Sequence, residues 1–187
     1  RSALEDPELG TSNGVSSLLI RLFGADLALL KCRDDTRCVL LAGEGSVFCS
    51  GFDMKACVDD LSMLKTYIVR LSKLIRSLRR LPVPVVVAAH GAAIAGGCAL
   101  LTGCDFIVGS SDGTYGYPVH QLGISPAVTI PTLFQKLGEG RARSMILGGE
   151  LMHGVDALAC GLLTHVEETA QDTKSRAIAF AESLAQT

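Results

Sequence analysis

The sequence predicts an α/β domain in which buried strands and helices alternate along the chain. Short runs rich in Val and Leu, typical of buried strands, are separated by segments whose apolar residues recur at helical spacing. Hydrophobic residues make up 48% of the chain and charged residues 19%, which is enough to build a large aliphatic core. No repeat, linker or low-complexity tract divides the 187 residues. These observations indicate one layered domain, residues 1–187, with right-handed crossovers between its parallel strands.

In the first half of the chain we expect helix, strand, loop and helix, in that order. Leucines at helical spacing predict a helix over residues 15–31. Residues 38–42 form a continuous apolar run and predict a buried strand, which is followed by a turn-rich stretch at 43–46 and a loop at 47–53. Between residues 61 and 78, apolar residues alternate steps of three and four, which predicts a long helix with one buried face.

The second half continues the alternation. A Val-rich run predicts a strand over residues 83–89, and small apolar residues predict a buried helix over 96–103. The other expected elements are a strand at 105–108, a turn at 110–113, helices at 126–137, 139–147 and 155–161, a last strand at 162–166 and a closing amphipathic helix at 172–186.

Charge and cysteine usage exclude several classes of protein. Seventeen basic and nineteen acidic side chains give a net charge of −2, so a nucleic-acid partner is not expected. The cysteines lack the spacing of zinc ligands or of a small disulfide scaffold, so we expect no metal and free thiols in a reducing compartment, the cytoplasm or an organellar matrix. They are Cys32, Cys38, Cys49, Cys57, Cys98, Cys104 and Cys160.

The longest uncharged run does not predict a membrane span. No Asp, Glu, Lys or Arg occurs from Leu81 to Cys104, which is long enough to cross a bilayer. Prolines and glycines divide this run into a short strand, a turn and a helix, the pattern of buried parallel-sheet structure. The chain begins at Arg1 without a signal segment, and we expect further residues upstream of it.

Two glycine-containing loops, residues 48–53 and 90–97, each follow a predicted strand. Glycine allows the backbone to approach a ligand closely and to adopt a positive φ, and a following helix start leaves N–H groups unpaired. Such donors suit an oxygen atom that gains negative charge during a reaction. The alternative is that these glycines only allow strand and helix to pack tightly.

These loops belong to a series of sequence blocks that runs along nearly the whole chain. The blocks are residues 37–43, 48–54, 84–91, 95–98, 104–105, 114–118, 122–126 and 149–163. In this order and spacing they resemble the crotonases, also called the enoyl-CoA hydratase/isomerase superfamily. The block 48–54 is highly characteristic of that family, and 95–98 is similar to its second glycine loop.

The resemblance implies a crotonase-like spiral of ββα units, with two roughly perpendicular sheets surrounded by helices, assembled as a homotrimer or as a hexamer of two trimers. The family's N-terminal strands and C-terminal helices would then lie outside this chain. It implies an acyl-CoA substrate whose coenzyme A is part of the substrate, with no tightly bound cofactor. It also implies that the backbone N–H groups of Phe52 and Gly96 stabilise a thioester enolate.

The residues that a hydratase of this family uses as acid and base are replaced here. The two glutamate positions of the family correspond to Ala99 and Val119, and the acid of its dienoyl isomerases would fall near Ala127. None of these side chains transfers a proton, so ordinary hydration is doubtful and a non-hydratase reaction such as decarboxylation or isomerisation stays open. The alternatives are a non-catalytic acyl-CoA-binding or scaffold protein and, less favoured, a serine protease of the related ClpP-like spiral fold, for which no convincing Ser and His pair is present.

Several other side chains are candidates for the same site. His120, next to the second lost glutamate position, is a candidate general acid or base. Neighbouring positions on an extended segment point to opposite sides, however, so a surface or core histidine is the favoured alternative. The remaining candidates for substrate binding are Ser50, Gly51, Asp53, Met54, Lys55, Gly97, Ala99, Tyr115, Tyr117 and Val119. The tyrosines are more often packing residues at such positions. His90, His153 and His165 are expected to be structural, and Cys49, Cys98 and Cys104 to act as small buried apolar residues.

Overall fold

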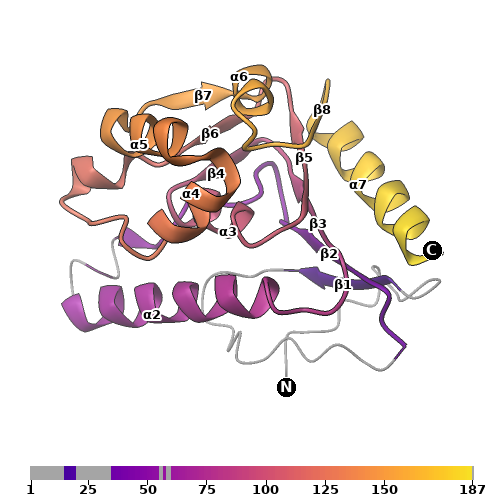
Figure 1. Cartoon of the computed structure of the whole chain (residues 1–187), viewed down its shortest axis with the longest axis horizontal. Coiled ribbons are helices and arrows are strands. Elements are labelled where there is room, and N and C mark those ends of the chain that lie inside the picture. Colours follow the sequence, from indigo (N-terminus) through magenta and orange to yellow (C-terminus); the bar gives the residue numbers. More distant parts are fainter. Residues whose placement is uncertain (1–14, 20–34, 55–56, 58–59, 187) are drawn as a thin grey trace.

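Two sheets form the centre of the molecule (Figure 1). The computed structural model describes residues 15–19, 35–54, 57 and 60–186. The larger sheet is parallel and has the strand order β1-β2-β3-β5-β8, and the smaller sheet has the order β4-β6-β7. The strands are β1 (Val15–Leu19), β2 (Cys38–Ala42), β3 (Val85–Ala89), β4 (Ala92–Ile94), β5 (Phe106–Ser110), β6 (Thr114–Gly116), β7 (Leu151–His153) and β8 (His165–Glu167). The predicted α/β class is confirmed.

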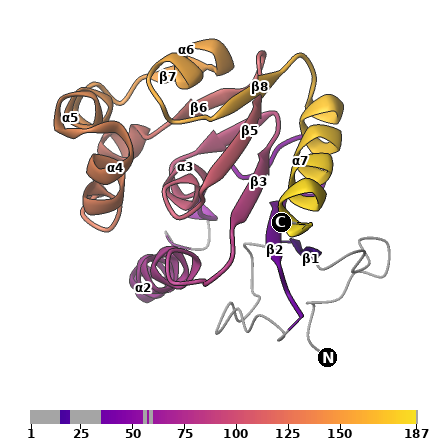
Figure 2. The ribbon, with the colours of Figure 1, turned by 45° about the vertical axis from the view of Figure 1, so that its right-hand side comes forward.

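Helices cover the sheets on both sides. Figures 1 and 2 show α7 on one face of the larger sheet and α2 and α3 on the other. The helical elements are α2 (Leu61–Leu78), α3 (Gly96–Leu101), the 3₁₀ helix η1 (Pro118–Leu122), α4 (Ile130–Leu137), α5 (Glu139–Gly148), α6 (Gly154–Ala159) and α7 (Ala170–Ala185). Among the described helices, none is both long and apolar enough to cross a membrane.

The central strands are apolar at every position because both of their faces are covered. In β2, Cys38 and Leu40 belong to the apolar cluster beneath α7, whereas Val39 and Leu41 belong to the cluster on the opposite face. Side chains alternate between the two faces of a strand, so a strand buried on both sides reads as a continuous apolar run. The strands expected at 38–42 and 83–89 are therefore confirmed as β2 and β3, the latter beginning at Val85.

Helix α2 begins and packs as its sequence indicates. The side chain of Asp60 accepts a hydrogen bond from the Ser62 N–H at 2.8 Å, which caps the first turn. The apolar stripe is buried in the C-terminal half of the helix, through Leu71, Leu74 and Ile75. The same spacing leaves the opposite face of α2 in solvent.

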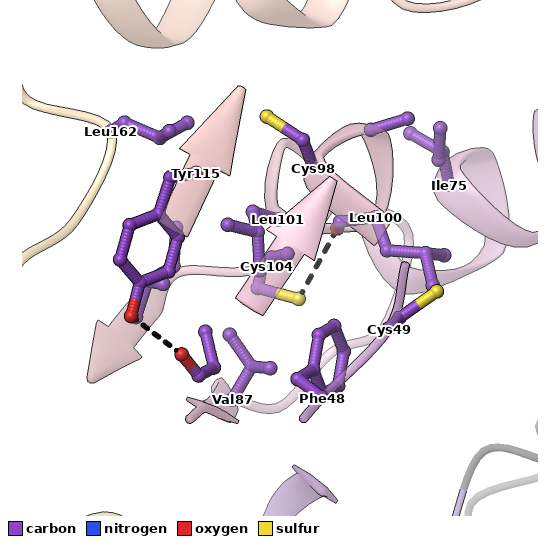
Figure 3. Packing of buried hydrophobic residues seen from close by; sticks show 14 of the residues in the cluster. Phe48, Cys49, Ile75, Val87, Cys98, Leu100, Leu101, Cys104, Tyr115 and Leu162 are labelled. Carbon is purple, nitrogen blue, oxygen red and sulfur yellow. Dashed lines mark hydrogen bonds between the residues drawn. The ribbon is translucent and has the colours of Figure 1, made fainter. Parts of the chain in front are cut away.

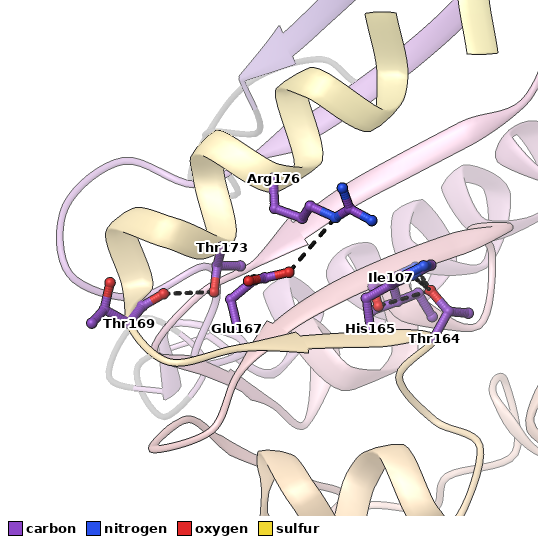
Figure 4. A network of polar contacts seen from close by, with 7 residues as sticks. All are labelled: Ile107, Thr164, His165, Glu167, Thr169, Thr173 and Arg176. Atoms are coloured by element: carbon purple, nitrogen blue, oxygen red, sulfur yellow. Dashed lines mark hydrogen bonds and ion pairs between the residues drawn. The ribbon is translucent and has the colours of Figure 1, made fainter. Parts of the chain in front are cut away.

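Hydrogen bonds stabilise the start of α7 and join the residue before β8 to β5 (Figure 4). The Thr169 hydroxyl accepts from the Asp172 N–H at 3.1 Å and caps the first turn of α7. Thr164, just before β8, accepts from the Ile107 N–H at 2.8 Å. An exposed ion pair at 3.7 Å joins Arg176 to Glu167, and such pairs contribute little stability, so the capping and the buried face of α7 position this helix.

The helix expected over residues 15–31 is wrong where the structure describes it. Val15–Leu19 is a strand that pairs in parallel with all five residues of β2, from Val15 opposite Cys38 to Leu19 opposite Ala42. An uncovered edge of β2 would leave a row of backbone groups without partners, and this pairing outweighs the helical spacing of the leucines. Residues 20–31 lie outside the described part of the chain.

The family resemblance implied a second sheet, but sequence periodicity did not predict the strands that form it. Its strands β4, β6 and β7 have three residues each, too few to display the alternation that distinguishes a strand. They form by pairing across long stretches of sequence, Ala93 with Tyr115 and Tyr115 with Met152. Sequence periodicity carries no information about such contacts.

A buried tyrosine joins the two sheets (Figure 3). Tyr115, in β6, is fully buried, and its hydroxyl donates to the Ala89 carbonyl oxygen at 2.7 Å while it accepts from the Ser110 N–H at 2.9 Å. Gly109 and Gly113 leave room for the phenol, because a Cβ atom on either would collide with its oxygen. The phenol therefore occupies a fitted space between β3, β5 and β6.

We predict that Tyr115→Phe lowers the free energy of unfolding by about 1–3 kcal/mol, because a buried N–H and a buried carbonyl lose their shared partner. Urea titration followed by circular dichroism measures the change. Tyr67→Phe is a matched control, since the Tyr67 hydroxyl makes no hydrogen bond within the described chain. Equal stability of the two variants would contradict the role given to Tyr115.

Candidate functional site

The two glycine loops lie side by side. The Cys49 N–H donates to the Ala92 carbonyl at 3.0 Å, and the Ile94 N–H donates to the Cys49 carbonyl at 3.0 Å. This parallel bridge between Cys49 and Ala93 places the loop after β2 against the loop after β3. The hydrogen bonds are between backbone groups, so they fix the two main chains relative to each other.

Close approach of the loops requires glycine at two positions. Gly51 has φ of 109°, and a Cβ atom on it would lie 3.2 Å from the Ala95 Cβ and 3.6 Å from the Gly96 nitrogen. A Cβ atom on Gly97 would overlap the Cys49 carbonyl oxygen. For Gly97 the structure therefore supports the packing explanation, and this residue permits the contact between the loops.

Ala95 holds an unusual backbone conformation where the second loop becomes helix α3. Its φ of 53° and ψ of −113° make it the non-glycine residue with positive φ among the described residues. Such a conformation costs of order 1–3 kcal/mol and persists where surrounding contacts impose it. Its N–H donates to the Gly116 carbonyl at 2.9 Å and its carbonyl accepts from the Ala99 N–H at 2.9 Å, so neighbours on both sides hold the turn.

Two amide groups at this junction have no hydrogen-bond acceptor among the described residues. Gly96 is the first residue of α3, and the first N–H groups of a helix have no acceptor within it. Within the described residues, neither the Gly96 N–H nor the Phe52 N–H donates to another protein group. The Phe52 ring lies 3.3 Å from the position of a Cβ on Gly96 and packs against the Tyr67 ring with centroids 5.4 Å apart.

Ala99 and Val119 are part of the apolar core. Ala99 is fully buried in α3, and Val119 is 7% exposed in η1. A buried region without a titratable side chain at these two positions supplies no proton donor or acceptor there. Tyr117 belongs to the same core, and its hydroxyl is hydrogen bonded to Thr129 Oγ1 at 2.6 Å, a partner that the sequence analysis did not identify.

The phenol hydroxyls of both candidate tyrosines, Tyr115 and Tyr117, form hydrogen bonds inside the protein. Burial raises the pKa of Tyr115 and of Tyr117, and each hydroxyl has a buried hydrogen-bond partner. Both phenols therefore remain protonated at neutral pH. Tyr67, in α2, contacts Phe52 instead, and the only sequence signal for this contact was the position of Tyr67 within the predicted helix.

His120 lies apart from its neighbour Val119. Residues 118–122 form a 3₁₀ helix, in which Val119 is buried and His120 is exposed. The imidazole lies against Gly149 at the C-terminal end of α5, and a Cβ atom on Gly149 would overlap the ring.

The outer part of the first loop is partly open to solvent. Ser50 is exposed, and Asp53 and Met54 are half-buried. Lys55 lies outside the described residues. Within the residues that the structure describes, no group of three or more His, Cys, Asp or Glu side chains could hold a metal ion.

The cysteines near the loops are unreactive. Burial raises the pKa of the Cys49 thiol to about 11 and those of Cys98 and Cys104 to about 12. A thiol with so high a pKa is protonated at neutral pH and is a poor nucleophile. All six cysteines in the described part of the chain are free, in agreement with the expectation of small buried apolar residues.

His90 ties the second loop to the turn after β2. Its ring is fully buried, with Nδ1 at 3.2 Å from the Ala88 carbonyl oxygen and Nε2 at 3.2 Å from the Gly45 carbonyl oxygen. Burial is the largest effect on this ring and lowers the pKa of His90. His90 is therefore a neutral structural residue near pH 7, as expected.

Comparison with known proteins identifies the family. The family model described as Enoyl-CoA hydratase/isomerase matches residues 12–187. The chain therefore belongs to the enoyl-CoA hydratase/isomerase family, and its fold is the crotonase fold.

Three relatives illustrate the similarity. A Thermus thermophilus protein assigned to the enoyl-CoA hydratases is 31% identical over 150 residues, which cover 75% of this chain and 59% of that protein. Human mitochondrial methylglutaconyl-CoA hydratase is 28% identical over 163 residues, covering 86% and 48%. The crystal structure of an enoyl-CoA hydratase from Bacillus anthracis has a TM-score of 0.77 at 28% identity, covering 83% and 61%. The chain thus spans about half to three-fifths of the length of these relatives.

We predict that Gly97→Ala destabilises the fold by about 3 kcal/mol or more, because the added methyl group displaces the Cys49 carbonyl and separates the loops. Thermal and urea unfolding measure the effect. Gly140→Ala is the matched control, since Gly140 is likewise the second residue of a helix but has open space around it. That variant is expected to be neutral or up to about 1 kcal/mol more stable. Similar stability of both variants would contradict the fitted contact.

We also predict that the free energy of unfolding decreases as the pH is lowered, because of His90. In the unfolded chain this imidazole has an ordinary pKa of about 6.5, and burial lowers it in the folded chain. Below about pH 6.5 the unfolded chain takes up a proton that the folded chain does not, so the free energy of unfolding decreases, and above that pH the contribution is fully present. Between pH 5 and 8, the urea midpoint should change less with pH in His90→Gln than in the native chain. The exposed His153→Gln is the control. An unchanged slope in His90→Gln would rule this out.

Proposed function

We propose that this protein binds acyl-CoA thioesters and stabilises a thioester enolate with the N–H groups of Phe52 and Gly96. One observation carries the proposal: in the described part of the chain both amides lack a protein acceptor, and the segments that hold them touch each other through Gly51 and Ala95. Two fixed donors on adjacent main chains suit one oxygen atom between them. Family membership supplies the thioester as the ligand class.

The proposed donors act because their geometry is set before the substrate binds. The Cys49 bridge, the turn at Ala95 and the start of α3 hold the two backbones in place. Fixed donors in a site that excludes water need no reorganisation when the carbonyl oxygen becomes an enolate oxygen, and loss of one such donor costs about 3–4 kcal/mol. Each N–H donates to the thioester oxygen, which gains charge as the enolate forms.

Apolar side chains at the glutamate positions favour a reaction that needs little acid or base. For a malonyl-type thioester, the bond between the α carbon and the carboxylate breaks, carbon dioxide leaves, and the electron pair forms the enolate held by the two amides. Water then protonates the α carbon, and the acyl-CoA is released. Ala99 and Val119 supply no group for the hydration of an enoyl thioester. A lyase of this kind, or an isomerase, is therefore the proposed enzyme class.

The second candidate function is an acyl-CoA-binding protein without catalysis, which the apolar Ala99 and Val119 also favour. It would use the same two amides to hold the thioester carbonyl. The strained conformation of Ala95 favours the enzyme, because stored backbone strain clusters at functional sites.

We further propose that the protein self-associates as a homotrimer or a dimer of trimers. Four apolar side chains on neighbouring elements are 40–65% exposed: Leu147, Leu151, Val155 and Leu158. Clustered exposed apolar residues mark interaction surfaces. The free thiols of the described chain support a reducing compartment, for which we propose the cytoplasm.

A panel of enoyl-, malonyl- and hydroxyacyl-CoA thioesters tests the function. Products are resolved by liquid chromatography with mass spectrometry, and binding is measured in parallel by calorimetry. Loss of carbon dioxide or migration of a double bond supports the enzyme. Binding without turnover supports the acyl-CoA-binding protein, and absence of both overturns the coenzyme A proposal.

We predict that replacing either amide donor by an ester oxygen lowers kcat about 10²–10³-fold for the thioester that the panel identifies. Phenyllactic acid at position 52 and glycolic acid at position 96 remove the N–H and keep the side chain. Glycolic acid at position 140 is the control, because the Gly140 N–H lies in the exposed first turn of α5. Full activity of the substituted proteins at 52 and 96 would contradict the proposed donors.

A further inference from the structure

The outer face of α2 carries a row of positively charged side chains that form no ion pair within the described residues. No Asp or Glu occurs from Leu61 to Cys104. Lys65, Lys73, Arg76 and Arg80 are exposed and follow one another at steps of eight, three and four residues, so they lie along one side of the helix and its last turn. We call these four residues the cationic row. Figure 1 shows α2 along one border of the molecule, opposite β7 and α6.

The cationic row is not used to hold the fold together. None of its four side chains takes part in an ion pair or side-chain hydrogen bond within the described chain, unlike Arg79, which donates to the Thr102 carbonyl at 3.2 Å. Arg76 is three residues from Lys73 and four from Arg80, and like charges at these spacings destabilise a helix. The chain as a whole has a net charge of −2, so this face differs from the average surface.

The same helix reaches the proposed thioester site from its other side. Tyr67 of α2 packs against Phe52, with ring centroids 5.4 Å apart. A partner bound along the cationic row is therefore next to the helix that borders the two amides.

We propose that the cationic row is a docking surface for an acidic protein that carries its acyl group as a thioester and presents it to the site at Phe52 and Gly96. The delivery step rests on the proposed function, whereas docking does not. The four cations complement an acidic surface on a partner, and complementary charge increases the rate of encounter.

The observations favour such a protein over other anionic partners. A helix that lies on a membrane inserts a broad apolar face. The apolar face of α2 is buried in the C-terminal half of the helix and half-buried before it, and Val69 is the exposed apolar residue beside the row. The net charge of −2 lacks the excess of positive charge typical of a nucleic-acid-binding domain.

Charge reversal tests the proposal with binding and activity as separate readouts. Binding of fluorescent crotonyl-loaded acyl carrier protein is followed by anisotropy for the native chain, for Lys73→Glu/Arg76→Glu and for the control Arg37→Glu/Arg143→Glu. The control residues are exposed, and neither forms an ion pair within the described chain. We expect about 10- to 100-fold weaker binding for the first variant, with steep salt dependence in the native chain, and no change for the control.

Binding of crotonyl-CoA should change less than twofold in the Lys73→Glu/Arg76→Glu variant. If the variant loses equal affinity for crotonyl-CoA and for the crotonyl-loaded carrier protein, the row is a contact for coenzyme A phosphates and the proposal is overturned. Tighter binding of the native chain to vesicles of equimolar phosphatidylglycerol and phosphatidylcholine than to the carrier protein would overturn the proposal in favour of a membrane. A changed oligomeric state on charge reversal would overturn it in favour of a second copy of the chain. Absence of carrier-protein binding would also overturn it. Carrier-protein binding without thioester turnover would contradict only the proposed catalysis.

Discussion

The backbone bridge between Cys49 and Ala93 is the contact on which the candidate site depends. It requires that the loops after β2 and β3 approach closely, and that approach exists because Gly51 and Gly97 have no side chains. Everything that lies at the junction follows from it: the position of Phe52, the turn at Ala95 and the outward-facing start of α3. The larger sheet supports the bridge by presenting the ends of two neighbouring parallel strands at the same edge.

A site built from main-chain groups has a particular consequence for function. The proposed donors would remain when side chains around them change, so the ability to bind a carbonyl oxygen could persist without the acid and base that a hydratase needs. The two positions that the family resemblance aligns with glutamates hold Ala99 and Val119, which contribute to the core. The chain therefore combines the family's backbone framework with an apolar interior, and this combination directs the proposal toward enolate chemistry that draws its proton from water.

The sequence predicted the elements whose periodicity is long or whose burial is complete. The strand at Cys38–Ala42 and the helix at Leu61–Leu78 were found at the expected residues. Sequence periodicity did not predict β1, which depends on pairing with β2, or the 3₁₀ helix that separates His120 from Val119. The family resemblance located Phe52 and Gly96, but the contact with Tyr67 and the strained Ala95 required the folded structure.

Infrared spectroscopy of a bound thioester tests the central claim most directly. A saturated acyl-CoA with a ¹³C-labelled thioester carbonyl would be added to the protein, and the carbonyl stretch isolated by subtraction of the unlabelled complex. Two N–H donors on one oxygen weaken the carbonyl bond, so the account predicts a lower stretching frequency in the complex than in water. An unshifted band from a demonstrably bound thioester would contradict it, because the carbonyl would then lie outside the reach of the Phe52 and Gly96 amides.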